Sequence, residues 1–396
     1  MITRFLRQIL PFALLSIALL SAILQPTPPF ASAEPIYIQN PDVKTLFSFH
    51  HRTATYMFGL DPDLEVILSG GNTKKPDDNA ANWWIINDAP QTGFRSVVKD
   101  AKMSSKYKAV TSFQLNNHPH IFGLHKDVGA NIWRINNDAK GFELVKYKGK
   151  MSPNHSRIVS FQLKGEPYIF GLHPDVGANI WRITEGPNGP AFNLVKHKAK
   201  MSPHYDYLTV FYLDGHPYLF GLHSGKDGSG VGANIWRIKD DPSKGFDLVM
   251  YGAKFPRQYD YVLPFELGRR PYLLAVVSKN YLNRAADMLE APPYLERTTS
   301  AEVIARAADL FVEWGEGYGC IWEIKGAPNS LSIKKVSKSI PMSHNYRNVS
   351  TFEQAGKVYI FGVHKDHYAN IWRVNDDPAT GFSLVYYGRT DKTIGP

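Results

Sequence analysis

Residues 168–183 read Tyr-Ile-Phe-Gly-Leu-His-Pro-Asp-Val-Gly-Ala-Asn-Ile-Trp-Arg-Ile, and close copies of this stretch recur along the chain. Three copies begin at His120, Tyr218 and Tyr359, and two weaker ones begin at Tyr56 and Tyr272. Their third residues are separated by 64, 48, 50, 54 and 87 positions. The 396-residue chain therefore holds six copies of one repeat, with a basic period near 48 and insertions in the first, fourth and fifth copies.

Each period contains four short runs rich in β-branched and aromatic residues, bounded by Gly, Asn, Asp or Pro. In the second copy these runs are Val110–Leu115, Pro119–His125, Ala130–Asn136 and Phe142–Tyr147. Four antiparallel strands in about 40–50 residues are typical of a β-propeller blade, whereas the coils of a β-helix are about half as long. We therefore predict an all-β fold, a six-bladed β-propeller with four antiparallel strands per blade.

The predicted blades span residues 43–103, 108–151, 156–201, 206–255, 258–341 and 346–388. The last copy completes its fourth strand at Tyr386-Tyr387 and the first begins near Val43, so we expect the ring to close end to end, helped by Ile36–Ile38. The repeated tryptophans are expected in the packing between blades. The glycine of each Phe-Gly-Leu run is expected to let strands approach closely near the channel.

The N-terminus has the three parts of a secretory signal peptide. Arg4 and Arg7 supply positive charge, Ile9–Leu24 form the apolar run, and Ala31-Ser32-Ala33 matches a cleavage site. The alternative is an uncleaved membrane anchor, but the apolar run of 16 residues is short for a span. We predict a signal peptide at 1–33 with cleavage after Ala33, a mature propeller of residues 34–396 without a membrane span, and a secreted or periplasmic location.

The formal net charge is +9, and removal of Arg4 and Arg7 leaves +7, which favours anionic ligands or surfaces. The basic residues form no dense run in an exported chain, so we expect no nucleic-acid partner. Cys320 is the single cysteine, which excludes an internal disulfide and the class of small disulfide-stapled secreted domains.

Chain direction reverses at every strand, so the connections fall alternately on two faces of the ring. The connections between second and third strands share a face with those that join a fourth strand to the next blade. We call this the loop face, and the opposite one the turn face. The three insertions, at 64–81, 224–230 and 278–319, all fall on the loop face. Function in repeat scaffolds gathers where insertions gather, so the loop face is the predicted functional face.

Polar residues recur at equivalent positions around the connection between second and third strands. The candidate ligand-binding residues are His125, Asp127, Asn131, His173, Asp175, Asn179, His223, Asn234, His364, Asp366 and Asn370. The alternative is that His and Asn fix the loop, because Asn tolerates left-handed turns and bonds to nearby backbone.

The insertion at 278–319 carries a helical pattern. Thr299-Ser300-Ala301-Glu302 resembles a capping box, and apolar residues follow at helical spacing. We predict a helix from about Ser300 to Trp314 as a helical insertion in blade five. It covers the divergent fifth blade or, alternatively, forms a lid over a substrate.

The motifs of serine hydrolases, zinc proteases and P-loop NTPases are absent from the sequence. Cys320 aligns with the Asn of the other copies, which indicates a buried thiol and not a nucleophile. One His and one Asp per blade do not supply a metal centre, so no metal or cofactor is expected. A pair of catalytic carboxylates stays open among Asp61, Glu302, Glu313 and Glu316, which lie on loops of the same face.

The run 176–183, one per blade after a Phe-Gly-Leu strand, resembles the repeats of tectonin- and tachylectin-type β-propeller lectins. The resemblance covers residues 43–388 and lies in the pattern of the repeats. It implies repeated pockets for sugars or bacterial surface glycans, without enzymatic activity. Copies one and five lack the His, and copy five has Cys320 and Glu323 in place of Asn and Arg, so four pockets are expected instead of six.

Three functions stay open from the sequence, and binding is favoured over catalysis. The first is a secreted, monomeric binding module that recognises a glycan or other polar or anionic surface ligand through repeated loops, with avidity from equivalent sites. The second is a hydrolase or lyase with a single site over the channel beneath residues 278–319. The third is a protein-interaction scaffold in the cell envelope.

Overall fold

The computed structural model describes residues 45–60, 80–223, 232–255, 259–277, 317–343, 346–364 and 368–389. All of them belong to the unit Lys44–Pro396. Within these residues the regular structure consists of β-strands and three short 3-10 turns, Pro90–Thr92, Pro242–Lys244 and Pro378–Thr380. None of the described segments is a helix long and apolar enough to cross a membrane. The helix expected at 300–314 and the leader lie outside the described residues.

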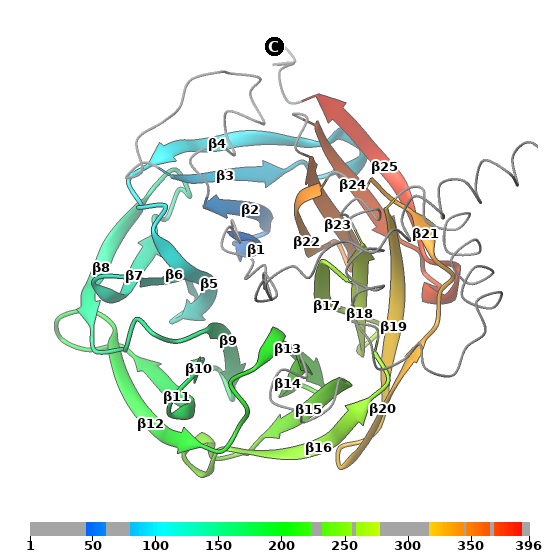
Figure 1. The fold of residues 1–396 in the computed structure, drawn as a ribbon. Coiled ribbons are helices and arrows are strands. Elements are labelled where there is room, and N and C mark those ends of the chain that lie inside the picture. The colour runs from blue at the N-terminus through cyan, green and yellow to red at the C-terminus, as the bar shows by residue number, and fades with distance from the viewer. Residues whose placement is uncertain are drawn as a thin grey trace, which may run out of the picture. The chain divides into compact units, whose positions relative to one another are not determined.

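Six antiparallel sheets follow one another along the chain, each built from one continuous segment, and we number them as blades 1 to 6 (Figure 1). Blade 1 contains β1 (Thr45–His51), β2 (Ala54–Leu60), β3 (Ala81–Ile86) and β4 (Phe94–Ala101). Blade 2 contains β5 (Tyr107–Leu115), β6 (His118–His125), β7 (Gly129–Ile135) and β8 (Phe142–Gly149). Blade 3 contains β9 (Arg157–Leu163), β10 (Glu166–His173), β11 (Gly177–Thr184) and β12 (Ala191–Ala199).

The second half of the ring repeats this order. Blade 4 contains β13 (Tyr205–Leu213), β14 (His216–His223), β15 (Gly232–Ile238) and β16 (Phe246–Ala253). Blade 5 contains β17 (Tyr261–Leu267), β18 (Arg270–Val277), β19 (Tyr318–Ala327) and β20 (Ser330–Lys335), and the short β21 (Ile340–Pro341) also pairs with β19. Blade 6 contains β22 (Tyr346–Gln354), β23 (Lys357–His364), β24 (Tyr368–Val374) and β25 (Phe382–Arg389). The six-bladed propeller with four antiparallel strands per blade is confirmed.

The first strands of the blades surround the centre of the ring (Figure 1). Contacts run from β1 to β5, β9, β13, β17 and β22 in turn, and β22 contacts β1 again. The ring therefore closes end to end, and no strand among those described is shared between the first and last blades. Residues 36–38, expected to help the closure, lie outside the described residues.

Aromatic packing at the seam between blades 6 and 1 matches the packing at internal seams. The phenylalanine that opens a fourth strand contacts the buried phenylalanine of the Phe-Gly-Leu run in the preceding blade. The ring centroids are 5.9 Å apart for Phe192 and Phe122, 5.8 Å for Phe246 and Phe170, and 5.1 Å for Phe94 and Phe361 across the seam. Large buried rings of this kind dominate the packing energy, so the seam is stabilised by the same contacts as the rest of the ring.

Hydrogen bonds between neighbouring first strands add a polar belt around the centre. Side chains of one blade bond to the next blade at every step: Gln114 to the His50 carbonyl, Thr111 to Ser160, Arg157 to the Asp206 carbonyl, Tyr207 to the Asp260 carbonyl, Tyr261 to the Arg347 carbonyl, and Ser48 to the Thr351 carbonyl. Inner-strand backbone groups that face the channel gain partners in this way, as buried polar groups require.

A stacked aromatic pair joins the first and second strands of every blade near the turn face. The pairs are Phe49–Tyr56, Phe113–His120, Phe161–Tyr168, Phe211–Tyr218, Phe265–Tyr272 and Phe352–Tyr359, with centroids 5.1 to 5.3 Å apart. The two rings are seven positions apart in all six copies. This spacing persists in copy one, which lacks the His of the loop face, and in copy five, which lacks both the His and the Asn.

We expect Gly93→Ala to weaken the seam specifically. Gly93 has φ +88° and its Cβ would lie 2.6 Å from Cε2 of Tyr386, a ring of blade 6. The positive φ alone costs alanine about 1 kcal/mol, and displacement of the packed ring adds about 1–3 kcal/mol. Urea unfolding of the purified chain measures the loss.

Gly245→Ala is the matched control, because Gly245 occupies the same turn of blade 4 with φ +85°. Its Cβ would meet only the flexible Lys196 side chain, at 3.3 Å from Cε. Gly93→Ala should therefore be less stable than Gly245→Ala. Equal unfolding midpoints would show that the seam does not pack as described.

Candidate binding face

The candidate residues of the loop face fall into two groups by exposure. Asn131, Asn179, Asn234, Asn370, His173, His223 and His364 are buried, whereas the side chains of Asp127 and Asp175 are 62% and 78% exposed. The His125 side chain is 12% exposed, and Asp366 lies outside the described residues. Contact of these residues with a ligand stays a prediction, while the structure shows what the buried ones do inside the blade.

Each asparagine of blades 1 to 4 stands opposite a β-bulge in the fourth strand. In blade 2 the register slips so that Asn131 faces both Tyr147 and Lys148. The corresponding sets are Asn179 with His197 and Lys198, Asn234 with Tyr251 and Gly252, and Asn82 with Lys99 and Asp100. A bulge leaves one residue out of the ladder and re-aims the neighbouring side chain.

The asparagine supplies the partner that the bulge has lost. Oδ1 of Asn131 accepts the N–H of Lys148 at 2.9 Å, and Lys148 has a left-handed φ of 53°. The same bond joins Asn179 to Lys198 at 3.0 Å, Asn234 to Gly252 at 2.8 Å and Asn82 to Asp100 at 2.9 Å. A buried side-chain amide thus satisfies a backbone donor that the sheet cannot, which fixes the bulge.

In blades 2, 3 and 4 the Nδ2 group of the same amide points to an aromatic ring that precedes or opens the first strand. Asn131 donates to the hydroxyl of Tyr107, and Asn234 donates to the hydroxyl of Tyr205 at 3.0 Å. Burial raises the pKa of Tyr107 to about 12, so the hydroxyl is protonated at neutral pH. In blades 2 and 4 the amide is therefore used at both ends, by a tyrosine and by a bulge. In blade 1, Nδ2 of Asn82 donates to the Ala80 carbonyl at 3.4 Å instead.

The glycine of the Phe-Gly-Leu run makes room for this ring. A Cβ on Gly123 would lie 2.7 Å from Cδ1 of Tyr107 and 3.0 Å from Cζ3 of Trp133. The expectation that these glycines allow close strand approach is wrong, because their close neighbours are aromatic side chains. Trp133 packs between blades as expected, because it is 4% exposed and shares a core cluster with Phe58 and Trp83 of blade 1. Its ring also lies edge-on to Tyr107 of its own blade.

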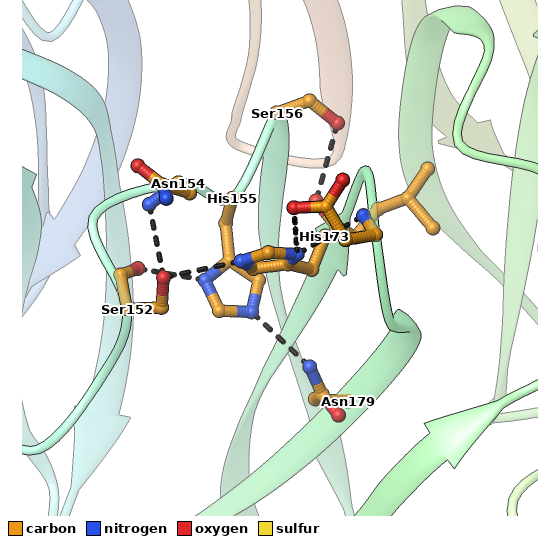
Figure 2. A network of polar contacts seen from close by, with 8 residues as sticks. Ser152, Asn154, His155, Ser156, His173 and Asn179 are labelled. Carbon is orange, nitrogen blue, oxygen red and sulfur yellow. Dashed lines mark hydrogen bonds and ion pairs between the residues drawn. The ribbon is translucent and has the colours of Figure 1, made fainter.

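Blade 3 replaces this tyrosine with His155 (Figure 2). The Nδ1–H of His155 donates to the Ser152 carbonyl at 2.8 Å, and Nε2 receives a hydrogen bond from Nδ2 of Asn179 at 3.2 Å. One ring nitrogen is thus a donor and the other an acceptor, which fits only the neutral ring. Burial lowers the pKa of His155, against the opposing effect of the Ser152 carbonyl, and nearby His173 lowers it further.

Ser152, His173 and Asp175 resemble a catalytic triad, but the His173 ring carries its proton on Nε2, the nitrogen that faces the serine. The backbone N–H of Asp175 donates to Nδ1 of His173 at 3.2 Å, so the neutral ring carries its proton on Nε2. Nε2 lies 3.2 Å from Oγ of Ser152 and therefore donates to it (Figure 2). A nucleophilic serine needs the reverse arrangement, with the histidine accepting its proton. The cluster therefore ties the loops together.

Blades 5 and 6 depart from this pattern. In blade 5, Cys320 stands in place of the asparagine, fully buried beside the Tyr259 hydroxyl at 3.2 Å, and the fourth strand is interrupted between β20 and β21. Burial raises the pKa of Cys320, which confirms the expectation of a buried thiol. In blade 6 the register continues past Asn370, and the outer Tyr387 stacks on Tyr368 at 5.1 Å.

Exposed aromatic rings on the fourth strands are a feature that the repeat pattern of the sequence did not indicate. Within the described residues, the large hydrophobic side chains that stay exposed all lie on fourth strands: Leu144, Tyr147, Leu194, Leu248, Tyr251, Leu384 and Tyr387. The tyrosines lie at the loop-face end, where the asparagine faces the strand, and His197 holds this position in blade 3. These four blades are the ones in which the sequence predicts pockets.

The described residues contain no group of three or more His, Cys, Asp or Glu side chains that would hold a metal ion. The carboxylates considered for catalysis, Asp61, Glu302, Glu313 and Glu316, all lie outside the described residues.

No family model and no curated protein matches the chain. In structure it is similar to a fucose-specific lectin from Aleuria aurantia, with 8% identity over 89% of this chain and 96% of that chain and a TM-score of 0.47. It is similar to the SapL1 lectin in complex with α-methyl fucoside, with 8% identity, 86% and 94% coverage and a TM-score of 0.47.

It is also similar to an α-L-arabinofuranosidase from Clostridium thermocellum, with 13% identity, 78% and 96% coverage and a TM-score of 0.42. Lectins and a hydrolase are thus both among the neighbours. Likeness at these identities and scores carries no argument about activity, and the tectonin-type resemblance stays an expectation.

Two buried histidines should make the propeller sensitive to acid. His155 takes the place of the tyrosine that opens the first strand in other blades, and burial lowers its pKa. His120 takes the place of the tyrosine of the stacked pair, and burial lowers its pKa to about 4. The unfolded chain takes up protons near pH 6.5 while the folded rings stay neutral, so the free energy of unfolding falls as the pH drops below that value. For His120 the loss at pH 5 is about 2 kcal/mol.

Urea unfolding at pH 7.5 and pH 5.0 measures this difference. In His120→Tyr/His155→Tyr, the fall in midpoint between the two pH values should be clearly smaller than in the wild type. The control is His204→Tyr, an exposed histidine, which should leave the fall unchanged. An identical pH dependence in the double variant and the wild type would refute the assignment.

Proposed function

We propose that the protein is a secreted, multivalent glycan-binding module that uses the loop face of blades 2, 3, 4 and 6. The observation that supports it is the exposed aromatic ring at the loop-face end of the fourth strand in each of these blades. Tyr147, Tyr251 and Tyr387 are 56%, 66% and 59% exposed. Tyrosine has an apolar ring and a polar hydroxyl, a combination that is enriched in binding surfaces.

The chemistry around these rings suits a sugar. The C–H face of a pyranose packs on an aromatic ring, while a carboxylate accepts hydrogen bonds from its hydroxyls. In blade 6 the Tyr387 ring stacks on Tyr368 and lies 6.4 Å from the His364 ring. In blades 2 and 3 the exposed carboxylates of Asp127 and Asp175 project from the loops of the same face.

Repetition favours binding over catalysis. Catalysis needs one site with matched groups, whereas the Ser-His-Asp look-alike of blade 3 is protonated the wrong way for it. Equivalent weak sites on one rigid ring raise the avidity for a repeating or surface-bound ligand without any new contact. The recurrence of an exposed ring at the same place on four blades, Tyr147, His197, Tyr251 and Tyr387, fits this use.

The test is a glycan array probed with the mature chain and with Tyr147→Ala/Tyr251→Ala/Tyr387→Ala. Binding to one glycan class by the wild type, and a loss of apparent affinity of about tenfold or more in the variant, are expected. The rings are exposed, so the variant should fold, which circular dichroism and unfolding midpoints check.

Leu144→Ala/Leu248→Ala/Leu384→Ala is the matched control. These leucines are 46% to 50% exposed on the same three strands, but three residues nearer the turn face. This variant should bind as the wild type does. No binding of the wild type to any glycan, or equal losses in the two variants, would contradict the proposal.

A further inference from the structure

Four lysines lie beside the exposed rings on two consecutive blades of the loop face. Lys148 and Lys198 are the second residues of the bulges, and Lys150 and Lys200 follow two positions later. All four are exposed. We call these four residues the lysine row. Nζ of Lys148 lies 5.1 Å from the centre of the Tyr147 ring, so a single ligand could contact both the ammonium group and the ring.

The lysine row has no carboxylate partner among the described residues. None of its four ammonium groups forms an ion pair within the part of the chain that the structure describes. The nearby acids on the connections between second and third strands, Asp127 and Asp175, lie 4.0 and 3.8 Å from Nδ1 of their own histidines.

The turn face differs, because eight of its cations are paired with carboxylates: Arg134 with Glu143, Arg182 with Glu166, Arg237 with Asp240, Lys239 with Asp247, Arg270 and Lys325 with Glu323, and Lys357 and Arg373 with Asp376. Lys140, Lys164 and Lys244 of this face form no ion pair among the described residues, but they are spread over three blades. Among the described residues, the lysine row thus leaves four neighbouring cations without a carboxylate partner, whereas many cations of the turn face have one. Such an asymmetry steers and holds anionic ligands on the unpaired face.

We propose that the lysine row binds a linear anionic polysaccharide, one that carries a carboxylate, sulfate or phosphate on its sugar units. The inference rests on the proposed glycan-binding function and names the class of glycan. The bulges hold the Lys148 and Lys198 backbones in fixed positions, and Tyr147 and His197 lie directly before them. A polysaccharide with regularly spaced negative charges would contact one aromatic ring and two lysines on each of the two blades.

The same geometry argues against a lipid surface. Insertion into the membrane interface needs apolar side chains next to the basic ones so that both reach the membrane together. The exposed Leu144 and Leu194 lie about 10 Å from the bulge along their strands, toward the turn face. The groups beside the lysine row are polar and aromatic, which fits a hydrated polymer.

The experiment compares binding of polygalacturonate, a linear polymer of carboxylated sugars, and of its methyl ester, which has the same backbone without charge. The mature chain should bind the acid form, with an affinity that falls as salt rises, and bind the ester at least about tenfold less well. Lys148→Gln/Lys150→Gln/Lys198→Gln/Lys200→Gln should lower binding of the acid form by about tenfold or more.

The control is Lys140→Gln/Lys164→Gln/Lys244→Gln/Lys325→Gln, which removes the same charge from the turn face and should change binding by less than about twofold. Equal losses in the two variants, equal binding of acid and ester, or binding of phosphatidylglycerol vesicles or duplex DNA in preference to the polymer would overturn the inference. Binding of a neutral glycan on the array without binding of the acid polymer would overturn this inference alone. Binding of no glycan, neutral or acidic, would overturn the proposed function as well.

Discussion

The asparagine amide of the third strand is the contact on which the rest of a blade depends. Its oxygen holds the bulge of the outer strand and its nitrogen holds the ring that precedes or opens the inner strand, as Asn234 does with Gly252 and Tyr205. Where Cys320 replaces it, the outer strand is interrupted. In blades 2 and 3 the bulge in turn holds an exposed ring, Tyr147 or His197, with a lysine directly after it. The asparagine side chain therefore links the packing inside the blade to the side chains that the outer strand exposes.

The ring tolerates unequal blades because each blade is complete in itself. No described strand is shared across the seam, and Phe94 packs on Phe361 there as Phe192 packs on Phe122 inside the ring. Insertions between second and third strands leave these contacts untouched, since the contacts are made by the strands. This explains how the fifth copy has lost the pattern of the loop face while its Phe265–Tyr272 stack persists.

The period, the four strands of each blade and the two faces follow from the sequence, because strand runs and turn residues recur at fixed offsets. The exposed tyrosines did not follow, because strict alternation in strands takes no account of a bulge, which shifts every later side chain by one position. The sequence pattern did not indicate the role of His155. It aligns with Tyr107 only through the Lys-Met-Ser run that precedes both residues, at 150–152 and 102–104. The recurring seven-residue spacing of Phe and Tyr was the available signal for the stack.

Residue-resolved hydrogen exchange in Asn179→Ala tests the central contact most directly. The amide of Lys198 lies on an exposed outer strand, yet its bond to Oδ1 of Asn179 should protect it from exchange in the wild type. In the variant its exchange should accelerate markedly, while the amides of Lys148 and Gly252, held by asparagines of other blades, should keep their rates. Unchanged protection at Lys198 would contradict the account, and so would equal acceleration at all three amides.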